Sequence, residues 1–277
     1  MVKERRLLGC VATLICIAST AHGQTRADCE RAYTPQRAQE GKDVIWEPIE
    51  DSMVGRMLEM ARVTAADKVY DLGSGDGKIV IAAAKQFGAT GVGIEYDADL
   101  VEHSRCLAAA EGVAHRVTFI QADIFESDFS DATVVTLYLT PRVLLRLLPA
   151  LLQMKPGTRV ASYSFMIGDW EPDAAIDSFG DGSAYLYLVP GNAAGAWTFR
   201  KTNGTESFDA ELEQTYQKIA GVADGSPVVG SLRGDELTFG FMQGGEKVRV
   251  DGVVEGDRIV ATVIRGATAA KYVATRR

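Results

Sequence analysis

Residues 69–77 read Val-Tyr-Asp-Leu-Gly-Ser-Gly-Asp-Gly, an apolar run that ends in an acid and three alternating glycines. A helix-like segment begins directly afterwards, at Lys78. This order predicts a strand, a tight turn and a helix. Glycines permit positive φ angles and let backbone N–H groups approach a ligand without a Cβ in the way. The turn is therefore shaped to hold a small ligand.

The charges around these glycines narrow the choice of ligand. A dinucleotide site spaces its glycines as GxGxxG and offers the helix N-terminus to a pyrophosphate. Here the spacing is GxGxG, and Asp71 and Asp76 place negative charge where a pyrophosphate would bind. The glycine spacing opposes a nicotinamide oxidoreductase, and the two acids favour a cationic ligand without phosphate. S-adenosylmethionine carries an ammonium and a sulfonium, and DLGSGDG at 71–77 resembles motif I of the class I S-adenosylmethionine-dependent methyltransferases.

Two further acids follow in the order of that family. Residues 91–95 read as a buried strand that ends in Glu95, where doubly wound nucleoside sites place a carboxylate on the ribose hydroxyls. Another apolar strand, 117–120, runs toward Asp123, and the resemblance implies that Asp123 accepts the adenine amino group. For Asp71 and Glu95, the competing interpretation is that they cap the following helices. The predicted cofactor-binding residues are Asp71, Gly73, Gly75, Gly77, Glu95 and Asp123.

The alternation of strands and helices predicts an α/β domain with a doubly wound, mostly parallel sheet. Its expected helices are 51–63, 77–87, 98–112 and 142–153, and its expected strands are 67–72, 91–96, 117–121, 133–138 and 158–164. The resemblance implies a further, antiparallel strand at 185–189. With 277 residues, of which 47% are hydrophobic, the chain suits one large domain plus a smaller one. We expect the methyltransferase domain to span residues 24–190.

Residues 191–277 differ in kind, because they are glycine-rich and alternate with period two. Two segments, 230–239 and 252–261, resemble each other, and each reads as a strand, a Gly-Asp turn and a strand. We therefore predict a small antiparallel β-barrel or β-sandwich, with a partial helical pattern only within 208–219. The tripeptide Gly-Ala-Trp at 195–197 is similar to the opening of lipocalin-type barrels.

The N-terminus predicts a cleaved secretory signal peptide over residues 1–23. Three basic residues, Lys3, Arg5 and Arg6, precede an apolar run at 7–21 that is short for a membrane span, with an uncleaved anchor as the alternative. The mature protein would then be periplasmic or secreted. S-adenosylmethionine is charged and made inside cells, so three possibilities stay open. The cofactor reaches that compartment, export is inefficient, or the fold serves as an exported non-catalytic binding protein with the β domain as its interaction surface.

Cysteine, histidine and charge set further bounds. Removal of the signal leaves Cys29 and Cys106, which either form a disulfide in an oxidising compartment or remain a loose free thiol and a buried thiol. The three histidines are scattered and predict no metal site.

A formal net charge of −8 at pH 7 argues against nucleic acid as a partner, and a membrane contact is expected only if the signal stays attached.

The methyl acceptor is expected beside Gly73, over the ends of the fourth and fifth strands. Enzymes that methylate base amines or glutamine usually end the fourth strand in an acid or amide followed by Pro-Pro and an aromatic residue. This chain has Leu-Tyr-Leu-Thr-Pro at 137–141 instead, which counts against those substrates. Because no acid follows the strand, we expect an amine that arrives deprotonated and a turnover that rises between about pH 7 and 9.

Three segments resemble the mitochondrial lysine methyltransferases that act on the ATP synthase and the adenine nucleotide translocase, and their bacterial relatives. The segments are 46–48 (Trp-Glu-Pro), 71–84 and 137–152, and the resemblance covers roughly residues 43–170. It implies N-methylation of an amine such as a protein lysine. The residues that it implies for the acceptor site and its lid are Tyr138 and Thr140, and Trp46 and Pro48. The competing interpretations are a buried sheet residue for Tyr138 and an aromatic staple for Trp46.

Overall fold

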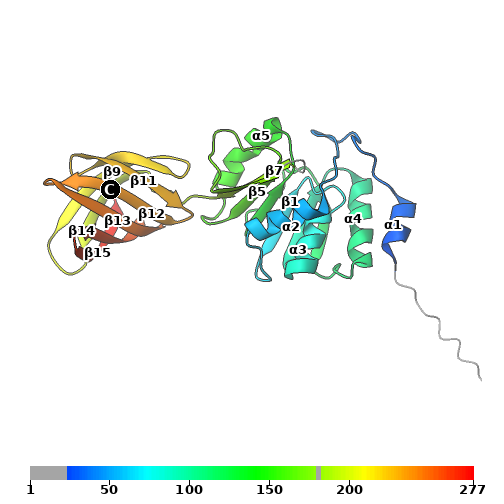
Figure 1. The fold of residues 1–277 in the computed structure, drawn as a ribbon, viewed down its shortest axis with the longest axis horizontal. Coiled ribbons are helices and arrows are strands. Elements are labelled where there is room, and N and C mark those ends of the chain that lie inside the picture. Colours follow the sequence, from blue (N-terminus) through cyan, green and yellow to red (C-terminus); the bar gives the residue numbers. More distant parts are fainter. Residues whose placement is uncertain (1–23, 179–181) are drawn as a thin grey trace, which may run out of the picture.

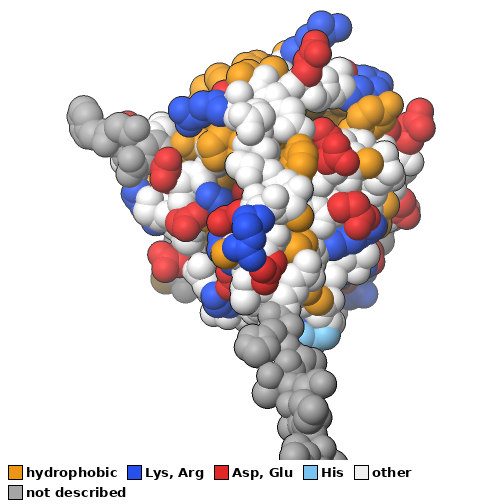
Figure 2. All heavy atoms as spheres, turned by 90° about the vertical axis from the view of Figure 1, so that its right-hand side faces the viewer, with side chains coloured by type: hydrophobic (Ala, Val, Ile, Leu, Met, Phe, Trp, Pro, Cys, Tyr) orange, Lys and Arg blue, Asp and Glu red, His pale blue; other side chains and the backbone are white. Residues whose placement is uncertain are grey.

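The computed structural model describes residues 24–178 and 182–277, so the expected signal peptide at 1–23 lies outside the described residues. A sheet with helices on both faces is followed by a closed antiparallel barrel (Figure 1). At the end of the molecule opposite the barrel, acidic and basic side chains are interspersed (Figure 2). Within the described ranges, none of the helices is both long and apolar enough to span a membrane.

The large domain contains a seven-stranded sheet in the order β3-β2-β1-β4-β5-β7-β6. Its strands are β1 (Lys68–Leu72), β2 (Thr90–Glu95), β3 (Val117–Gln121), β4 (Val134–Leu137), β5 (Arg159–Tyr163), β6 (Ala174–Ser178) and β7 (Gly182–Leu188). The first five strands run parallel, whereas β7 is antiparallel to both β5 and β6. The doubly wound sheet and its antiparallel strand are thus confirmed. The edge strand β6 was not predicted, because its five residues, Ala-Ala-Ile-Asp-Ser, form a short segment without the period-two alternation of a half-buried strand.

Helices cover both faces of this sheet because successive strand side chains point to opposite sides. The helices are α1 (Arg26–Ala32), α2 (Asp51–Met60), α3 (Lys78–Phe87), α4 (Ala98–Ala110) and α5 (Pro141–Leu152). On β1, Val69 packs in the core that includes α2 and α3, whereas Tyr70 and Leu72 pack in the core that includes α5. The short helix α1, which begins with a capping box from Thr25 and Asp28, was not predicted.

The strand order reverses between β1 and β4. From β1 the chain continues outward to β2 and β3, and then returns to place β4 on the other side of β1. In open α/β sheets, this reversal leaves a crevice outside the carboxyl ends of the two central strands, and ligands bind there. The glycine loop after β1 and the segment after β4 therefore meet at the same edge.

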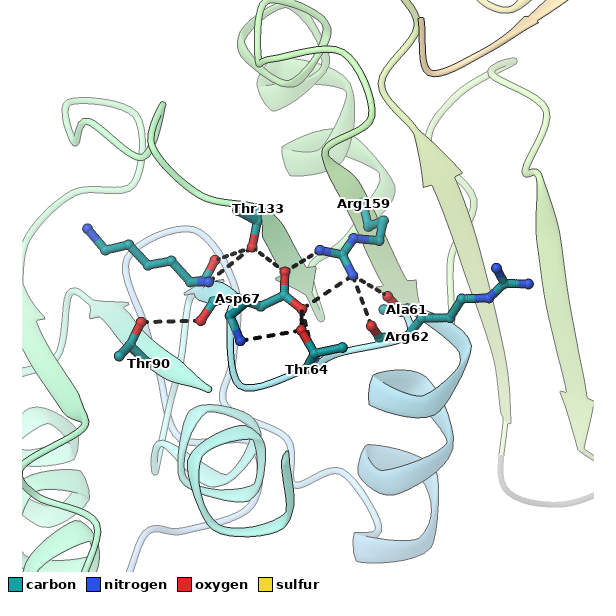
Figure 3. A network of polar contacts seen from close by, with 9 residues as sticks. Ala61, Arg62, Thr64, Asp67, Thr90, Thr133 and Arg159 are labelled. Atoms are coloured by element: carbon teal, nitrogen blue, oxygen red, sulfur yellow. Dashed lines mark hydrogen bonds and ion pairs between the residues drawn. The ribbon is translucent and has the colours of Figure 1, made fainter. Parts of the chain in front are cut away.

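A polar network fixes the opposite edge of the sheet (Figure 3). The Asp67 carboxylate forms an ion pair with Arg159 and accepts hydrogen bonds from Thr133 Oγ1 at 2.7 Å and from the Thr64 backbone N–H at 2.7 Å. Burial alone would raise the pKa of Asp67, but the hydrogen bonds from Arg159 and Thr133 outweigh it and hold the pKa below its ordinary value. The network joins the beginnings of β1, β4 and β5, so it positions the strands whose other ends form the crevice.

Eight antiparallel strands close the C-terminal barrel. They are β8 (Gly195–Lys201), β9 (Ser207–Thr215), β10 (Lys218–Ala223), β11 (Ser226–Arg233), β12 (Glu236–Gln243), β13 (Glu246–Glu255), β14 (Arg258–Arg265) and β15 (Thr268–Arg276). Each pairs with its neighbours in sequence, and β15 returns to pair with β8. Both predicted hairpins are present, but the partial helical pattern at 208–219 was wrong. Phe208, Ala210 and Leu212 alternate into the barrel core, as a strand requires.

The barrel and the large domain share a polar and aromatic contact. The ring of Tyr216 stacks on Trp170 with centroids 6.0 Å apart, and its hydroxyl donates to Asp169 at 2.6 Å. Lys218 forms an ion pair with Glu171 at 2.5 Å. The turn between β9 and β10 therefore rests on the 169–171 segment that follows β5.

Candidate active site

A cavity of about 320 Å³ opens over the carboxyl ends of β1 and β4. Part of its wall comes from residues 33–50, the irregular segment between α1 and α2, which we call the strap; positions 39–49 of it all line the cavity. Nine of the ten residues predicted from the sequence are brought together here: Trp46, Pro48, Asp71, Gly73, Gly75, Glu95, Asp123, Tyr138 and Thr140. The tenth, Gly77, does not line the cavity.

The glycine loop has the backbone that the sequence predicted. Gly73, Gly75 and Gly77 have φ angles of 79°, 55° and 77°. A Cβ on Gly75 would lie 2.6 Å from the indole Nε1 of Trp46, so the loop and the strap can approach only because this residue is glycine. A Cβ on Gly77 would lie 2.6 Å from the ring of Phe119. Gly77 thus serves the packing of α3 against β3 and is not a wall of the cavity.

Asp71 lies buried at the end of β1, where its carboxylate accepts a hydrogen bond from Thr136 Oγ1 at 2.7 Å. The Asp71 carboxylate therefore bonds to a residue of β4 and does not cap the following helix, which was the competing interpretation. Burial raises the pKa of Asp71 to about 7, and the nearby carboxylates of Asp76 and Glu95 add to the rise against the hydrogen bond from Thr136. A cation in the cavity would restore the charged form, because an opposite charge favours ionisation.

Glu95 joins the end of β2 to the glycine loop. Its Oε2 accepts the Gly75 N–H at 2.9 Å, and its Oε1 accepts the N–H groups of Tyr96 and Asp97 at 2.7 and 2.9 Å. The capping of α4 falls to Asp97, which accepts the Asp99 N–H at 2.8 Å. Glu95 is therefore placed to shape the loop from inside the cavity and does not cap the helix.

Asp123 faces the strap across the cavity. It forms an ion pair with Lys42, whose Nζ also lies 5.1 Å from the centre of the Tyr96 ring. The hydrogen bond from Lys42 holds the pKa of Asp123 below its ordinary value. Sequence reasoning missed Lys42 and Tyr96. The position of Tyr96, next to the acid at the end of β2, was a signal that could have indicated it, whereas Lys42 lies in an irregular segment without a pattern.

Aromatic side chains line the other part of the cavity. The half-buried ring of Tyr138 and the partly exposed ring of Phe165 form this wall. Behind the wall, the buried ring of Tyr163 meets Tyr138 edge to face, with centroids 4.6 Å apart. Burial raises the pKa of Tyr138, with Tyr163 and Glu47 contributing. Thr140 begins α5 at the mouth. An apolar, aromatic compartment beside a glycine loop can hold a small acceptor group against a ligand bound at the loop, and it excludes water from the contact between them.

A disulfide anchors the strap. Cys29 on α1 and Cys106 on α4 are bonded, with Cα atoms 5.7 Å apart. Of the two possibilities that the sequence left open, the structure has the disulfide. Further along the strap, the Gln39 side chain donates to Asp97 Oδ2 at 2.8 Å. The strap is thus held to α4 at its origin and again beside the cavity.

Comparison with known proteins agrees with this arrangement. Residues 71–174 match the ANTKMT methyltransferase domain. A protein-lysine N-methyltransferase of Saccharolobus islandicus is 40% identical over 147 residues, which are 51% of this chain and 91% of that protein. The chain belongs to the ANTKMT methyltransferase family. It is an S-adenosylmethionine-dependent methyltransferase.

Two further relatives extend the comparison. A human lysine N-methyltransferase named for the ATP synthase is 35% identical over 127 residues, 46% of this chain and 54% of that enzyme. The crystal structure described as an RNA methyltransferase from Salinibacter ruber in complex with S-adenosylhomocysteine is 50% identical. It covers 53% of this chain and 95% of its own, with a TM-score of 0.52. These likenesses concern the methyltransferase domain, and the barrel is not assigned to a family.

The cavity fits the cofactor on its own residues. Asp71 is a buried carboxylate, and a nearby cation would favour its ionised form. The ammonium and the sulfonium of S-adenosylmethionine are such cations. Glu95 and Asp123 lie at the ends of the next two strands and can accept from hydroxyl and amino groups. We propose that these three acids, with Gly73 and Gly75, are the residues that would hold the cofactor.

Cofactor affinity is expected to rise with pH. In the free protein Asp71 is largely protonated below its pKa of about 7, and a cationic ligand favours its ionised form, so binding releases a proton. Between about pH 5.5 and 7.5 the affinity should therefore increase by roughly tenfold. Calorimetric titration at several pH values checks this, and Asp71→Asn should bind weakly with little pH dependence. A wild-type affinity that is flat over this range would contradict it.

The methyltransferase domain is expected to bind the cofactor without the barrel. No residue after 190 lines the cavity, so residues 24–190 expressed alone should bind S-adenosylmethionine with an affinity close to that of the full chain. The fragment should unfold more easily, because Trp170 loses the stacking of Tyr216. Circular dichroism and calorimetry check both expectations. A fragment that folds but does not bind would show that the barrel shapes the site.

Proposed function

We propose that this enzyme N-methylates an amine of the lysine type, carried on a protein. The observation that carries the proposal is the aromatic compartment of Tyr138 and Phe165, which adjoins the glycine loop within one cavity. A slender aliphatic chain with a terminal nitrogen fits such a compartment. The names of the relatives support the same substrate class, since they describe protein-lysine and ATP synthase lysine methyltransferases.

When bound, S-adenosylmethionine supplies a methyl group that is open to in-line displacement. The protein's part is to exclude water and to orient the acceptor. Tyr138 and Leu139 follow β4 beside the glycine loop, and the strap covers the cavity from the other side. Burial also favours the neutral amine over the ammonium, because desolvation lowers the pKa of a lysine. The neutral amine carries the lone pair that the reaction needs.

RNA is the second candidate acceptor, because the Salinibacter ruber structure is described as an RNA methyltransferase. Charge argues against it for this chain. The net charge is −8, and acidic and basic side chains are interspersed on the face shown in Figure 2. Phosphate backbones need clustered lysine and arginine. We therefore propose a protein acceptor.

A methylation panel tests the choice between these acceptors. Protein and peptides rich in lysine, the same peptides with arginine in place of lysine, and total RNA are each incubated with radiolabelled S-adenosylmethionine. We expect label in the lysine peptides, with mass increments of whole methyl groups on the lysine nitrogen. Label in RNA alone would overturn the proposal. Cofactor binding without transfer to any acceptor would favour the non-catalytic binding protein instead.

We further propose that the enzyme is exported. Support comes from the Cys29–Cys106 disulfide, because disulfides persist mainly in oxidising compartments. Expression in a Gram-negative host followed by fractionation tests this. We expect periplasmic protein whose intact mass corresponds to a chain that begins near Gln24. A full-length product in the membrane fraction would indicate an uncleaved anchor, and a reduced cytoplasmic product would contradict export.

A further inference from the structure

An ion pair on the strap stands beside the acceptor compartment. Glu47 lies between two predicted lid residues, Trp46 and Pro48, and all three line the cavity. Its Oε2 lies 3.0 Å from Nε of Arg37. The Glu47 side chain is 30% exposed, whereas that of Arg37 is 72% exposed. A partly buried carboxylate is thus neutralised by a cation that lies mainly in solvent.

The other carboxylates at the strand ends have partners within the fold. Asp71 accepts from Thr136, Glu95 accepts three backbone N–H groups, and Asp123 is paired with Lys42. These three lie on the cofactor side of the cavity. Glu47 lies on the strap and lines the same cavity as Tyr138, and its charge contributes to the raised pKa of that phenol. The sequence showed no acid after the fourth strand, and the fold supplies one from a distant segment.

We propose that the Glu47 carboxylate binds the amino group of the methyl acceptor, which arrives as an ammonium, and that the Arg37 guanidinium pairs with Glu47 until the acceptor displaces it. The inference rests on the proposed amine methylation and adds the residue that recognises the amine. The guanidinium already at Glu47 shows that the position accommodates a cation. Because the Arg37 side chain is largely solvated, it can leave at little cost, as exposed ion pairs contribute little to stability.

The movement of charge during methyl transfer favours a carboxylate beside the acceptor nitrogen. The acceptor ammonium first loses one proton to water, which leaves a lone pair on nitrogen. That lone pair forms the new C–N bond, while the C–S bond breaks and its electrons remain on sulfur. One positive charge therefore moves from sulfur to nitrogen. A carboxylate beside the nitrogen binds the arriving ammonium and also stabilises the charge that develops as the methyl group is transferred.

Two substitutions with opposite expected effects test this role. The probe is poly-L-lysine, and cofactor affinity is followed separately with S-adenosylhomocysteine. Glu47→Gln should lower kcat/KM between about tenfold and a hundredfold, as expected for a lost charged hydrogen bond, and leave cofactor affinity unchanged. Arg37→Gln should lower KM, because the competing cation is gone. Glu47→Asp should recover part of the activity, and Glu50→Gln, an exposed acid at the start of α2, is the control.

Two measurements separate recognition from a structural role. Calorimetric binding of poly-L-lysine to the protein loaded with S-adenosylhomocysteine should weaken in Glu47→Gln. The pH midpoint of turnover should fall in this variant, since Glu47 no longer favours the ammonium, while Tyr138 still lines the cavity and Arg37 remains on the strap. A structural ion pair predicts instead that Glu47→Gln and Arg37→Gln are equally impaired, and that result overturns the inference. If wild-type enzyme modifies no lysine at all, the proposed function itself fails.

Discussion

Replacement of Cys29 and Cys106 by serine is expected to lower the free energy of unfolding by roughly 4 kcal/mol. The disulfide joins residues 77 positions apart, and closing so long a loop removes many conformations from the unfolded chain. Urea denaturation of the wild-type and double-serine proteins, followed by circular dichroism, measures the difference. The single variant Cys106→Ser should lose as much as the double variant.

The same change should also weaken cofactor binding, because the disulfide anchors the helix from which the strap departs. In its absence the strap still has the Gln39 contact to Asp97 and the ion pair of Lys42 with Asp123. These are polar contacts near the surface, which stabilise little on their own. Reduction of the wild-type protein should reproduce the loss, while the double-serine protein should not respond to reductant. An unfolding free energy that is unchanged by both treatments would contradict the anchoring role.

The central sheet could be predicted because its chemistry is local. In β1, β2 and β3, an apolar run leads to an acid at or just beyond the carboxyl end, and parallel strands bring such ends to one edge. Asp71, Glu95 and Asp123 therefore meet in the cavity as their positions in the sequence implied. The hairpins of the barrel were equally local, because each Gly-Asp turn lies between two alternating strands.

The strap could not be predicted in the same way. Lys42 and Glu47 lie in an irregular segment whose course depends on partners far away in the sequence, including Asp123 and the disulfide to Cys106. Periodicity gives no signal for such contacts. The resemblance pointed to Trp46 and Pro48 as a lid. The role of the carboxylate between them could be inferred only from the fold, which places Glu47 in the wall of the cavity that Tyr138 also lines.

Gly77 shows that a sequence pattern can predict the need for a glycine and still misassign its role. Its place in the GxGxG pattern made it a predicted cofactor ligand, yet it caps α3 outside the cavity lining. Sequence spacing identifies a backbone that needs glycine, and the reason for the need differs from position to position. At Gly75 it is the approach of the Trp46 indole, and at Gly77 it is the packing of Phe119.

Glu95→Ala is expected to weaken the binding of S-adenosylmethionine by roughly tenfold to a hundredfold. A carboxylate that accepts from ribose hydroxyls makes charge-assisted hydrogen bonds, each of which contributes about 1.5–3 kcal/mol. In the present structure the same carboxylate holds the Gly75 N–H at 2.9 Å, so its loss also loosens the loop. Calorimetric titration measures the affinity, and Glu102→Ala, an exposed acid on α4, is the matched control.

Competition by adenosine and 2′-deoxyadenosine separates the hydrogen bonds of Glu95 to the ribose from its effect on the glycine loop. If Glu95 accepts from the ribose, wild-type protein should bind adenosine more tightly than its deoxy analogue, because the analogue lacks one of the two hydroxyl donors. Glu95→Ala should bind both nucleosides alike, since the acceptor is gone. A variant that weakens both nucleosides equally but keeps the discrimination would show that Glu95 acts only through the loop, by way of Gly75. Unchanged affinity for S-adenosylmethionine would remove Glu95 from the cofactor site altogether.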